Sequence, residues 1–294
     1  ASSNVRKTWF LISGFLVFII VLGWIFGQVY NSQSILIFAV GFSALTSIGS
    51  YWYSDKIVLS MYRAKLVAHD DNKELYHIVE NLCITAGLPV PKIFIIDEAQ
   101  PNAFATGRDK NHAVVAVTRG LLEKLDKTEL EGVIAHELSH IGNKDILLGT
   151  VVVILVGFVA MISDMFLRIS FWGGGRGRDR ENNQAGAILF ALGIVAAILA
   201  PLAAVLIQLA VSRKREFLAD VSGSLLTRYP EGLASALGKI SSDNNPMRKV
   251  NNASAHLFIC SPLRGRQKTA WLAKLFMTHP PIEERIRALR ELRV

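Results

Sequence analysis

The sequence predicts a mainly α-helical membrane protein, in which about four transmembrane helices are joined to an α+β domain with a small edge-strand sheet. Three observations predict this class. Hydrophobic residues make up 51% of the 294 residues, and the mean hydropathy of +0.35 is high for a soluble protein. No charged residue occurs between Thr8 and Ser54. Two further long apolar runs follow after a stretch of ordinary composition.

The first apolar run is long enough for two membrane spans, because one span needs about 20 apolar residues. Polar residues at 28–33 divide it into predicted spans at 9–27 and 34–53. Trp9, Tyr30 and the aromatic residues at 51–53 lie at the span ends, where amphipathic rings prefer the headgroup level. The run is too long for a cleaved signal peptide and lacks an evident small-residue cleavage site, so we interpret it as a retained anchor.

A second pair of apolar runs, at 146–171 and 185–211, predicts a transmembrane hairpin. Asp164 interrupts the first run and Pro201 the second, so this pair fits the pattern of a span less well. An ionisable group inside a span suggests a functional site. For Asp164 we favour a position near the membrane interface, where Arg168 can pair with it.

Basic residues predict the orientation of the chain and one of its partners. Lys and Arg flank the first, second and fourth apolar runs, so the charged regions are expected in the cytoplasm. Arg176, Arg178 and Arg180 contradict this rule, and the concordant early flanks decide the orientation. The net charge of +8 favours the lipid bilayer as a partner over nucleic acid, because much of the excess lies beside the apolar runs. Cys83 and Cys260 imply no disulfide framework.

The region after the second span has the patterns of a small α+β domain. Apolar residues at helical spacing predict a helix over 71–86 that stops at Gly87. Segments 92–96, 103–106 and 113–117 are rich in β-branched and aromatic residues, and turn-forming clusters at 97–101 and 107–111 separate them. This pattern predicts a small, mostly antiparallel sheet. His77 is interpreted as a surface residue and His112 as a structural one.

Two histidines four residues apart, His136 and His140, lie on one face of the next predicted helix. Zinc accepts imidazole nitrogens, and Glu137 is placed to act as a base toward water at the metal. Asp126 and Glu129 resemble a capping arrangement that begins this helix. The alternative is two ordinary surface histidines beside a glutamate, which is disfavoured because the chain has only 7 histidines.

A third zinc ligand has to come from elsewhere, and Glu216 is the strongest candidate because it follows the fourth apolar run directly. Asp220, one helical turn later, could accept a hydrogen bond from a ligating histidine and fix its tautomer. Taken alone, a solvent-facing helix start fits these two acidic residues equally well. If Glu216 binds the metal, the third and fourth runs either both span the membrane or both do not.

These motifs resemble the HtpX family of membrane-bound zinc metallopeptidases. The resemblance rests on His136-Glu137-Leu138-Ser139-His140, on Glu216-Phe217-Leu218-Ala219-Asp220, and on four apolar runs with a hairpin between the two motifs. Two further segments are similar to family motifs, Asn102-Ala103-Phe104-Ala105-Thr106-Gly107 and His279-Pro280-Pro281.

The resemblance implies a multi-pass endopeptidase of the bacterial inner membrane, with a zincin-like catalytic domain facing the cytoplasm. Its substrates would be misfolded or damaged membrane proteins and unfolded polypeptides, cleaved in quality control under stress. One Zn2+ per chain would be held by His136, His140 and Glu216, with Glu137 as the general base and Asp220 supporting a ligand. Residues Asn102, Ala103, Phe104, Ala105 and Thr106 would bind substrate as an added strand.

His279 would donate a hydrogen bond to the tetrahedral oxyanion in this interpretation. The alternative is a turn histidine held between Thr278 and Pro280.

The implied domain organisation places two transmembrane helices at 1–53 and the first half of the catalytic domain at 54–145. The hairpin occupies 146–212, and the second half of the catalytic domain occupies 213–294. Two other functions fit the sequence less well. A CAAX prenyl protease shares the same motifs but has more apolar spans, and a non-catalytic membrane scaffold or transporter would not need an intact HExxH. The sequence does not define an oligomeric state.

Overall fold

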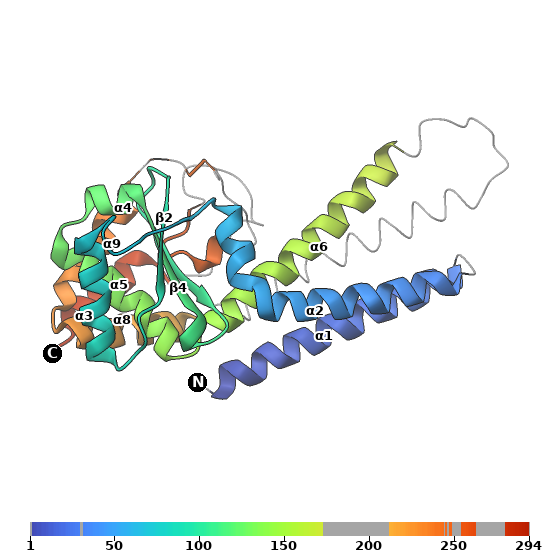
Figure 1. Ribbon diagram of the computed structural model, residues 1–294, viewed down its shortest axis with the longest axis horizontal. Helices are drawn as coiled ribbons and strands as arrows, with labels where there is room; N and C mark the ends of the chain where they lie inside the picture. Colours follow the sequence, from blue (N-terminus) through green and yellow to red (C-terminus); the bar gives the residue numbers. More distant parts are fainter. Residues whose placement is uncertain are drawn as a thin grey trace.

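The computed structural model describes residues 2–29, 32–172, 212–243, 245, 247–248, 254–262 and 280–293. Figure 1 shows a globular region from which long helices project in one direction. The projecting helices are α1 (Ser2–Val29), α2 (Gln33–Met61) and α6 (Ile146–Trp172). The globular region contains, in chain order, β1 (Lys65–Leu66), α3 (Lys73–Ala86), β2 (Lys92–Ile96), β3 (Ala103–Gly107), the 3-10 turn η1 (Lys110–His112), β4 (Ala113–Thr118), α4 (Arg119–Lys124), α5 (Lys127–Gly142), α8 (Arg213–Thr227), α9 (Pro230–Ser241), the 3-10 turn η2 (Ala255–Leu257) and α11 (Ile282–Glu291).

Two helices are long and apolar enough to cross a membrane, within the part of the chain that the structure describes. The apolar stretches are Asn4–Val21 in α1 and Leu36–Met61 in α2. A third candidate exists only if α5 and the start of α6 count as one span, and these two helices meet at a bend of 86°. The first three predicted apolar runs are thus helical. The fourth run, at 185–211, and the arginine-bearing loop before it lie outside the described residues, so four spans stay a prediction.

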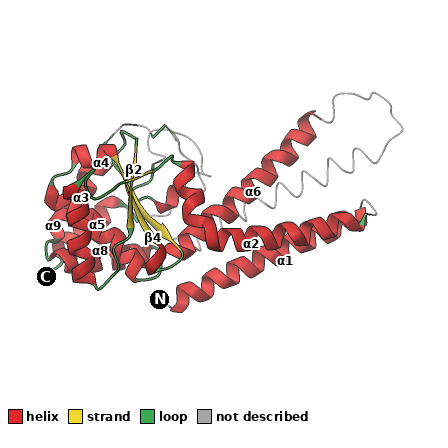
Figure 2. Cartoon of the chain, in the orientation of Figure 1, coloured by secondary structure: helices red, strands yellow, loops and turns green. Residues whose placement is uncertain are grey.

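The sheet has the strand order β1-β2-β4-β3, and Figure 2 shows it packed between helices. β3 pairs with β4 and β1 pairs with β2 in antiparallel fashion, whereas β2 and β4 run parallel. Two of the three pairings are antiparallel, which agrees with the prediction of a mostly antiparallel sheet, and the parallel central pair makes the sheet mixed. Strand composition identifies a strand but does not encode the direction of its neighbour.

Both faces of the sheet are covered, which explains why β3 and β4 are buried along their whole length. On one face Ala105 and Val115 join the core of α3, α5 and α9. On the other face Phe104 packs against Tyr62, just after α2, and against Phe258. The membrane-anchoring helix α2 thus ends as a part of the globular core.

The local sequence signals mark most helix boundaries correctly. Asn72 caps α3, and Gly87 ends it in the left-handed conformation at φ 63°. The predicted start of this helix at residue 71 was two residues early. His77 is exposed, as predicted, and the exposed His112 bonds to Asp109 through its ring.

Candidate metal centre

Helix α5 carries the two histidines and the glutamate between them. Asp126 and Glu129 form a complete capping box at its first turn, as predicted. Beyond this cap nearly every side chain of α5 is buried, because the helix lies between the sheet and the helices α3, α8 and α9. His136 and Glu137 are therefore fixed inside the globular core, with exposed fractions of 1% and 2%.

Helix α8 brings Glu216 and Asp220 against α5. The two helices approach closely because Gly223 has no side chain: a Cβ there would lie 2.8 Å from the backbone nitrogen of His136. Glu216 lies about two turns before Gly223 and Asp220 about one, so both carboxylates face α5. Both are buried, which excludes the alternative of a solvent-facing helix start.

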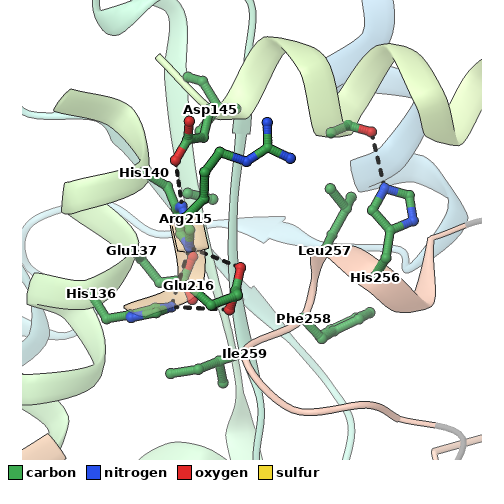
Figure 3. A pocket seen from close by; sticks show the side chains of 13 residues that line it. His136, Glu137, His140, Asp145, Arg215, Glu216, His256, Leu257, Phe258 and Ile259 are labelled. Atoms are coloured by element: carbon green, nitrogen blue, oxygen red, sulfur yellow. Dashed lines mark hydrogen bonds and ion pairs between the residues drawn. The ribbon is translucent and has the colours of Figure 1, made fainter. Parts of the chain in front are cut away.

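Three side chains converge on one point in Figure 3, His136, His140 and Glu216. The Nε2 atoms of the two histidines lie 3.2 Å apart. Glu216 Oε1 lies 3.8 Å from Nε2 of His140, and Glu216 Oε2 lies 4.0 Å from Nε2 of His136. A tetrahedral zinc ion with bonds of about 2.0–2.1 Å separates its ligands by roughly 3.3 Å. One ligand atom from each of the three side chains can be chosen so that all lie within 4.8 Å of one another, and two nitrogens and one carboxylate oxygen in this arrangement fit a catalytic zinc ion.

The remaining ring nitrogen of each histidine faces a carboxylate. His136 Nδ1 lies 2.9 Å from Asp220 Oδ1, and His140 Nδ1 lies 3.2 Å from Asp145 Oδ2. These contacts orient both rings with Nε2 toward Glu216, which is the arrangement that metal-binding histidines need. Asp220 occupies the supporting position predicted for it, whereas Asp145 was not predicted.

Arg285 of α11 completes the surroundings of His136. Its guanidinium is fully buried and donates two hydrogen bonds to the Asp220 carboxylate, at 2.8 Å and 2.6 Å, and one to the carbonyl of Ile259 at 3.0 Å. Burial alone would raise the pKa of Asp220, but the charge and hydrogen bonds of Arg285 lower it to about 2. Asp220 therefore stays ionised opposite His136.

The surroundings of His140 come from the base of the projecting helices. Asp145, which precedes α6, also accepts a hydrogen bond from the side chain of Asn4 in α1. Arg215 donates to the Asn4 side-chain oxygen at 3.1 Å. A chain of polar contacts thus links the first apolar helix to one histidine of the site.

The electrostatic environments of the two histidines differ. Burial lowers the pKa of His136 to about 4, despite the nearby Asp220. Burial acts in the same direction on His140, but the hydrogen bond to Asp145 and the charges of Glu216 and Glu137 raise its pKa to about 9. Burial raises the pKa of the Glu137 carboxyl to about 7. A carboxyl with a pKa near neutrality can both accept and return a proton at physiological pH.

Strand β3 is an edge strand beside this site, as the sequence predicted. The backbone N–H of Ala105 donates a hydrogen bond to the Glu137 carboxylate. At Ala103 the open edge is already occupied, because its carbonyl accepts the N–H of Ile259 at 3.0 Å. The side chain of Asn102 bonds to the backbone of Cys260 and is a structural clamp in this region. The outer edge of β3 is therefore paired at Ala103, and Ala105 faces the site through its N–H.

The structure brings five predicted residues together. A cavity of about 50 Å³ is lined by four of them, His136, Glu137, His140 and Glu216, and the fifth, Asp220, contacts His136. That volume accommodates a few water molecules. Residue 279 lies outside the described residues, so the role of His279 stays a prediction.

Sequence reasoning missed Arg285, Asp145 and Asn4. For Arg285 a signal was present: it lies between Ile282 and Leu289 on the apolar face of α11, where a charged residue is unexpected.

Residues 69–293 match the sequence family described as "Peptidase family M48". The chain belongs to this family. A protein named "Protease HtpX homolog" from Thermoanaerobacter pseudethanolicus is 45% identical over 294 residues, covering 99% of this chain and 96% of that protein. A protein of the same name from Tropheryma whipplei is 49% identical over 259 residues, covering 88% of this chain and 84% of that protein.

The solved crystal structure of S. mikatae Ste24p is similar to 98% of this chain with a TM-score of 0.53. The identity is 19% and the match covers 65% of the Ste24p chain, so this likeness shows a common fold alone. As a member of family M48 with two apolar helices of spanning length, the chain is a membrane zinc metallopeptidase. These two relatives confirm the resemblance to the HtpX family that the sequence motifs indicated.

Proposed function

We propose that this M48 peptidase is an endopeptidase that cleaves misfolded or damaged membrane proteins and unfolded polypeptides at the cytoplasmic face of the bacterial inner membrane. The observation that carries the proposal is the position of the metal centre. Its His140 is tied through Asp145 to the first apolar helix, and the edge strand β3 lies beside Glu137. A polypeptide emerging from the membrane would meet this site directly.

The residues hold distinct roles in this proposal. His136, His140 and Glu216 would bind one zinc ion, which supplies a Lewis acid for the peptide carbonyl and for water. Glu137 takes a proton from the attacking water and then gives it to the leaving amine nitrogen. Burial raises the pKa of this carboxyl in the metal-free chain, which favours proton uptake by Glu137. Asp220 and Asp145 keep the histidine rings oriented.

Substrate would bind as an extended strand along β3, with the backbone near Ala105 supplying main-chain hydrogen bonds. Strand addition supplies main-chain hydrogen bonds whatever the side chains, which suits a peptidase that cuts many different chains. His279 would donate a hydrogen bond to the oxyanion. The division of the chain at residues 53, 145 and 212 into helices, two catalytic halves and a hairpin belongs to the same proposal, as do its multi-pass orientation and four spans.

Replacing Glu137 by Gln in the purified, zinc-loaded protein tests the catalytic role. We expect cleavage of a membrane-protein substrate and of unfolded casein to fall at least about 100-fold, because the base is lost. Zinc content measured by metal analysis should stay at one per chain. Glu131→Gln, on the same helix but outside the site, is the matched control and should cleave normally. Full activity of Glu137→Gln would refute the assignment.

A second variant, Glu216→Ala, tests the third ligand. Loss of the carboxylate should release zinc and abolish cleavage together. A variant that keeps one zinc ion per chain would place the third ligand elsewhere.

A further inference from the structure

A second cavity, separate from the metal centre, lies where α1 and α2 meet the globular region. Its volume is about 310 Å³, and it shares only Ile146 with the cavity at the metal site. Three basic side chains line it, Arg108, Lys110 and Lys144. Its apolar wall is formed by Trp9, Tyr51, Leu88, Ile141, Ile146 and Leu147.

This basic cavity continues into an apolar groove along the two anchoring helices. The groove has a volume of about 510 Å³ and no charged residue in its lining, which comes from α1 and α2 alone. The two spaces share Trp9 and Tyr51, whose rings stack with centroids 5.7 Å apart. Beyond this aromatic pair the groove is lined by Ile12, Leu16 and Ile48, among others. The basic cavity and the apolar groove thus meet at the stacked rings of Trp9 and Tyr51.

The positive charges of the basic cavity are only partly compensated by acidic side chains. Arg108 lies over the ring of Trp52 at 4.4 Å and pairs with Asp109, the one acidic residue of the lining. Asp109 is also bonded to His112. Lys110 and Lys144 are exposed and form no ion pair within the described ranges, which leaves two ammonium groups for a ligand. Lys144 also has φ 59°, an uncommon backbone conformation for a residue with a side chain.

We propose that these two spaces form one binding site for an anionic phospholipid. The headgroup phosphate would lie between Lys110 and Lys144, and an acyl chain would lie in the groove along Ile12, Leu16 and Ile48. The chemistry of the two spaces matches the two parts of such a lipid, because clustered basic residues attract anionic headgroups and an uncharged groove on membrane helices suits hydrocarbon. Trp9 and Tyr51 stand at the boundary between them, where amphipathic rings are favoured.

The proposal is tested with the full-length protein in neutral detergent. Short-chain phosphatidylglycerol and phosphatidylcholine with identical acyl chains are titrated separately, and bound lipid is counted by native mass spectrometry. We expect phosphatidylglycerol to bind about 25-fold more tightly, at about fivefold for each of the two lysines. The double variant Lys110→Gln/Lys144→Gln should lose roughly 25-fold in affinity for phosphatidylglycerol, at about fivefold per lysine, with phosphatidylcholine unchanged.

Two controls locate the site. Lys56→Gln/Lys65→Gln makes the same charge change outside both cavities and should alter the affinity less than about twofold. Ala44→Trp fills the groove and should weaken both lipids equally, because the acyl chain loses its place. Equal effects of the two lysine pairs would show general charge attraction and would overturn the proposal. Binding of soluble glycerol phosphate as tight as that of the lipid would overturn the role of the groove.

Discussion

The two histidines of the HExxH motif share one helix and yet depend on different parts of the protein. His136 is supported from within the globular region, by Asp220 of α8 and the fully buried Arg285 of α11. His140 is supported from the base of the projecting helices, by Asp145 and, through it, Asn4 of α1. One half of the metal centre is thus part of the core, whereas the other half is attached to the membrane anchor.

This difference predicts two kinds of mutant. Changes around His136 should lower the stability of the fold, because they disturb a buried ion pair. Changes around His140 should mainly weaken metal binding, because their contacts lie at the edge of the globular region and hold one ring in place.

Arg285→Met should have the largest effect. It leaves the Asp220 carboxylate buried without its cation, and breaking a buried pair in this way costs about 3–5 kcal/mol. We expect the free energy of unfolding, measured by denaturant titration of the metal-free protein in detergent, to fall by that amount. Arg290→Met, on the same helix but in an exposed pair with Glu231, is the control and should leave the free energy of unfolding nearly unchanged. Equal stability of the two variants would contradict the assignment of Arg285.

Asp145→Asn should separate metal binding from stability. The His140 ring loses a charged acceptor, and loss of such a partner lowers zinc affinity by about 10- to 100-fold. Zinc affinity is measured by competition with a chromogenic chelator, and unfolding is measured as above. Above about pH 9, where His140 is neutral and its pairing with Asp145 no longer stabilises the fold, the expected change in unfolding free energy is small. An Asp145→Asn protein that binds zinc normally would show that the contact does not orient His140.

The pH dependence of zinc uptake should report on His140 and not on His136. Below about pH 9 His140 carries a proton that zinc has to displace, so affinity should rise about tenfold per pH unit between pH 7 and 9. His136 is already neutral above about pH 4 and adds nothing in this range. In Asp145→Asn the pKa of His140 falls, because its hydrogen-bond partner loses its charge. Zinc affinity should then stop rising at a lower pH than in the unchanged protein.

The same shift has a consequence for the metal-free fold. The pKa of His140 is raised above its unfolded value near 6.5, so its stabilising contribution is complete below pH 6.5 and is lost as the pH rises through about 9. Metal-free protein that became more stable between pH 7 and 9 would contradict this assignment.

Asn4→Ala should have the smallest effect. It removes one hydrogen bond to Asp145 and one from Arg215 but leaves the contact between Asp145 and His140 intact. We expect zinc affinity to fall only several-fold, in line with about 1 kcal/mol for one hydrogen bond. Thr8→Ala, one turn later on α1, bonds only within its own helix and is the control. A loss as large as that of Asp145→Asn would show that α1 is essential to the centre.

The sequence by itself determined the features that depend on neighbours within a few residues. The spacing of His136 and His140, the capping box at Asp126 and the apolar length of α1 and α2 all follow from helix geometry and composition. The edge strand before the motif was also predicted, although the parallel pairing of β2 and β4 was not. Glu216 fitted a ligand and a surface residue equally well until the family resemblance was considered.

Only the tertiary structure decided how these pieces form one centre. Asp220 and Arg285 are 65 residues apart, and Asn4 and Asp145 are 141 residues apart. No local periodicity relates such residues, because their contact depends on how helices pack, as at Gly223 where α8 meets α5. The packing also sets the pKa values of the two histidines at about 4 and about 9, which their identical side chains and shared helix do not predict. Burial and the distance to a charged partner are properties of the folded chain alone.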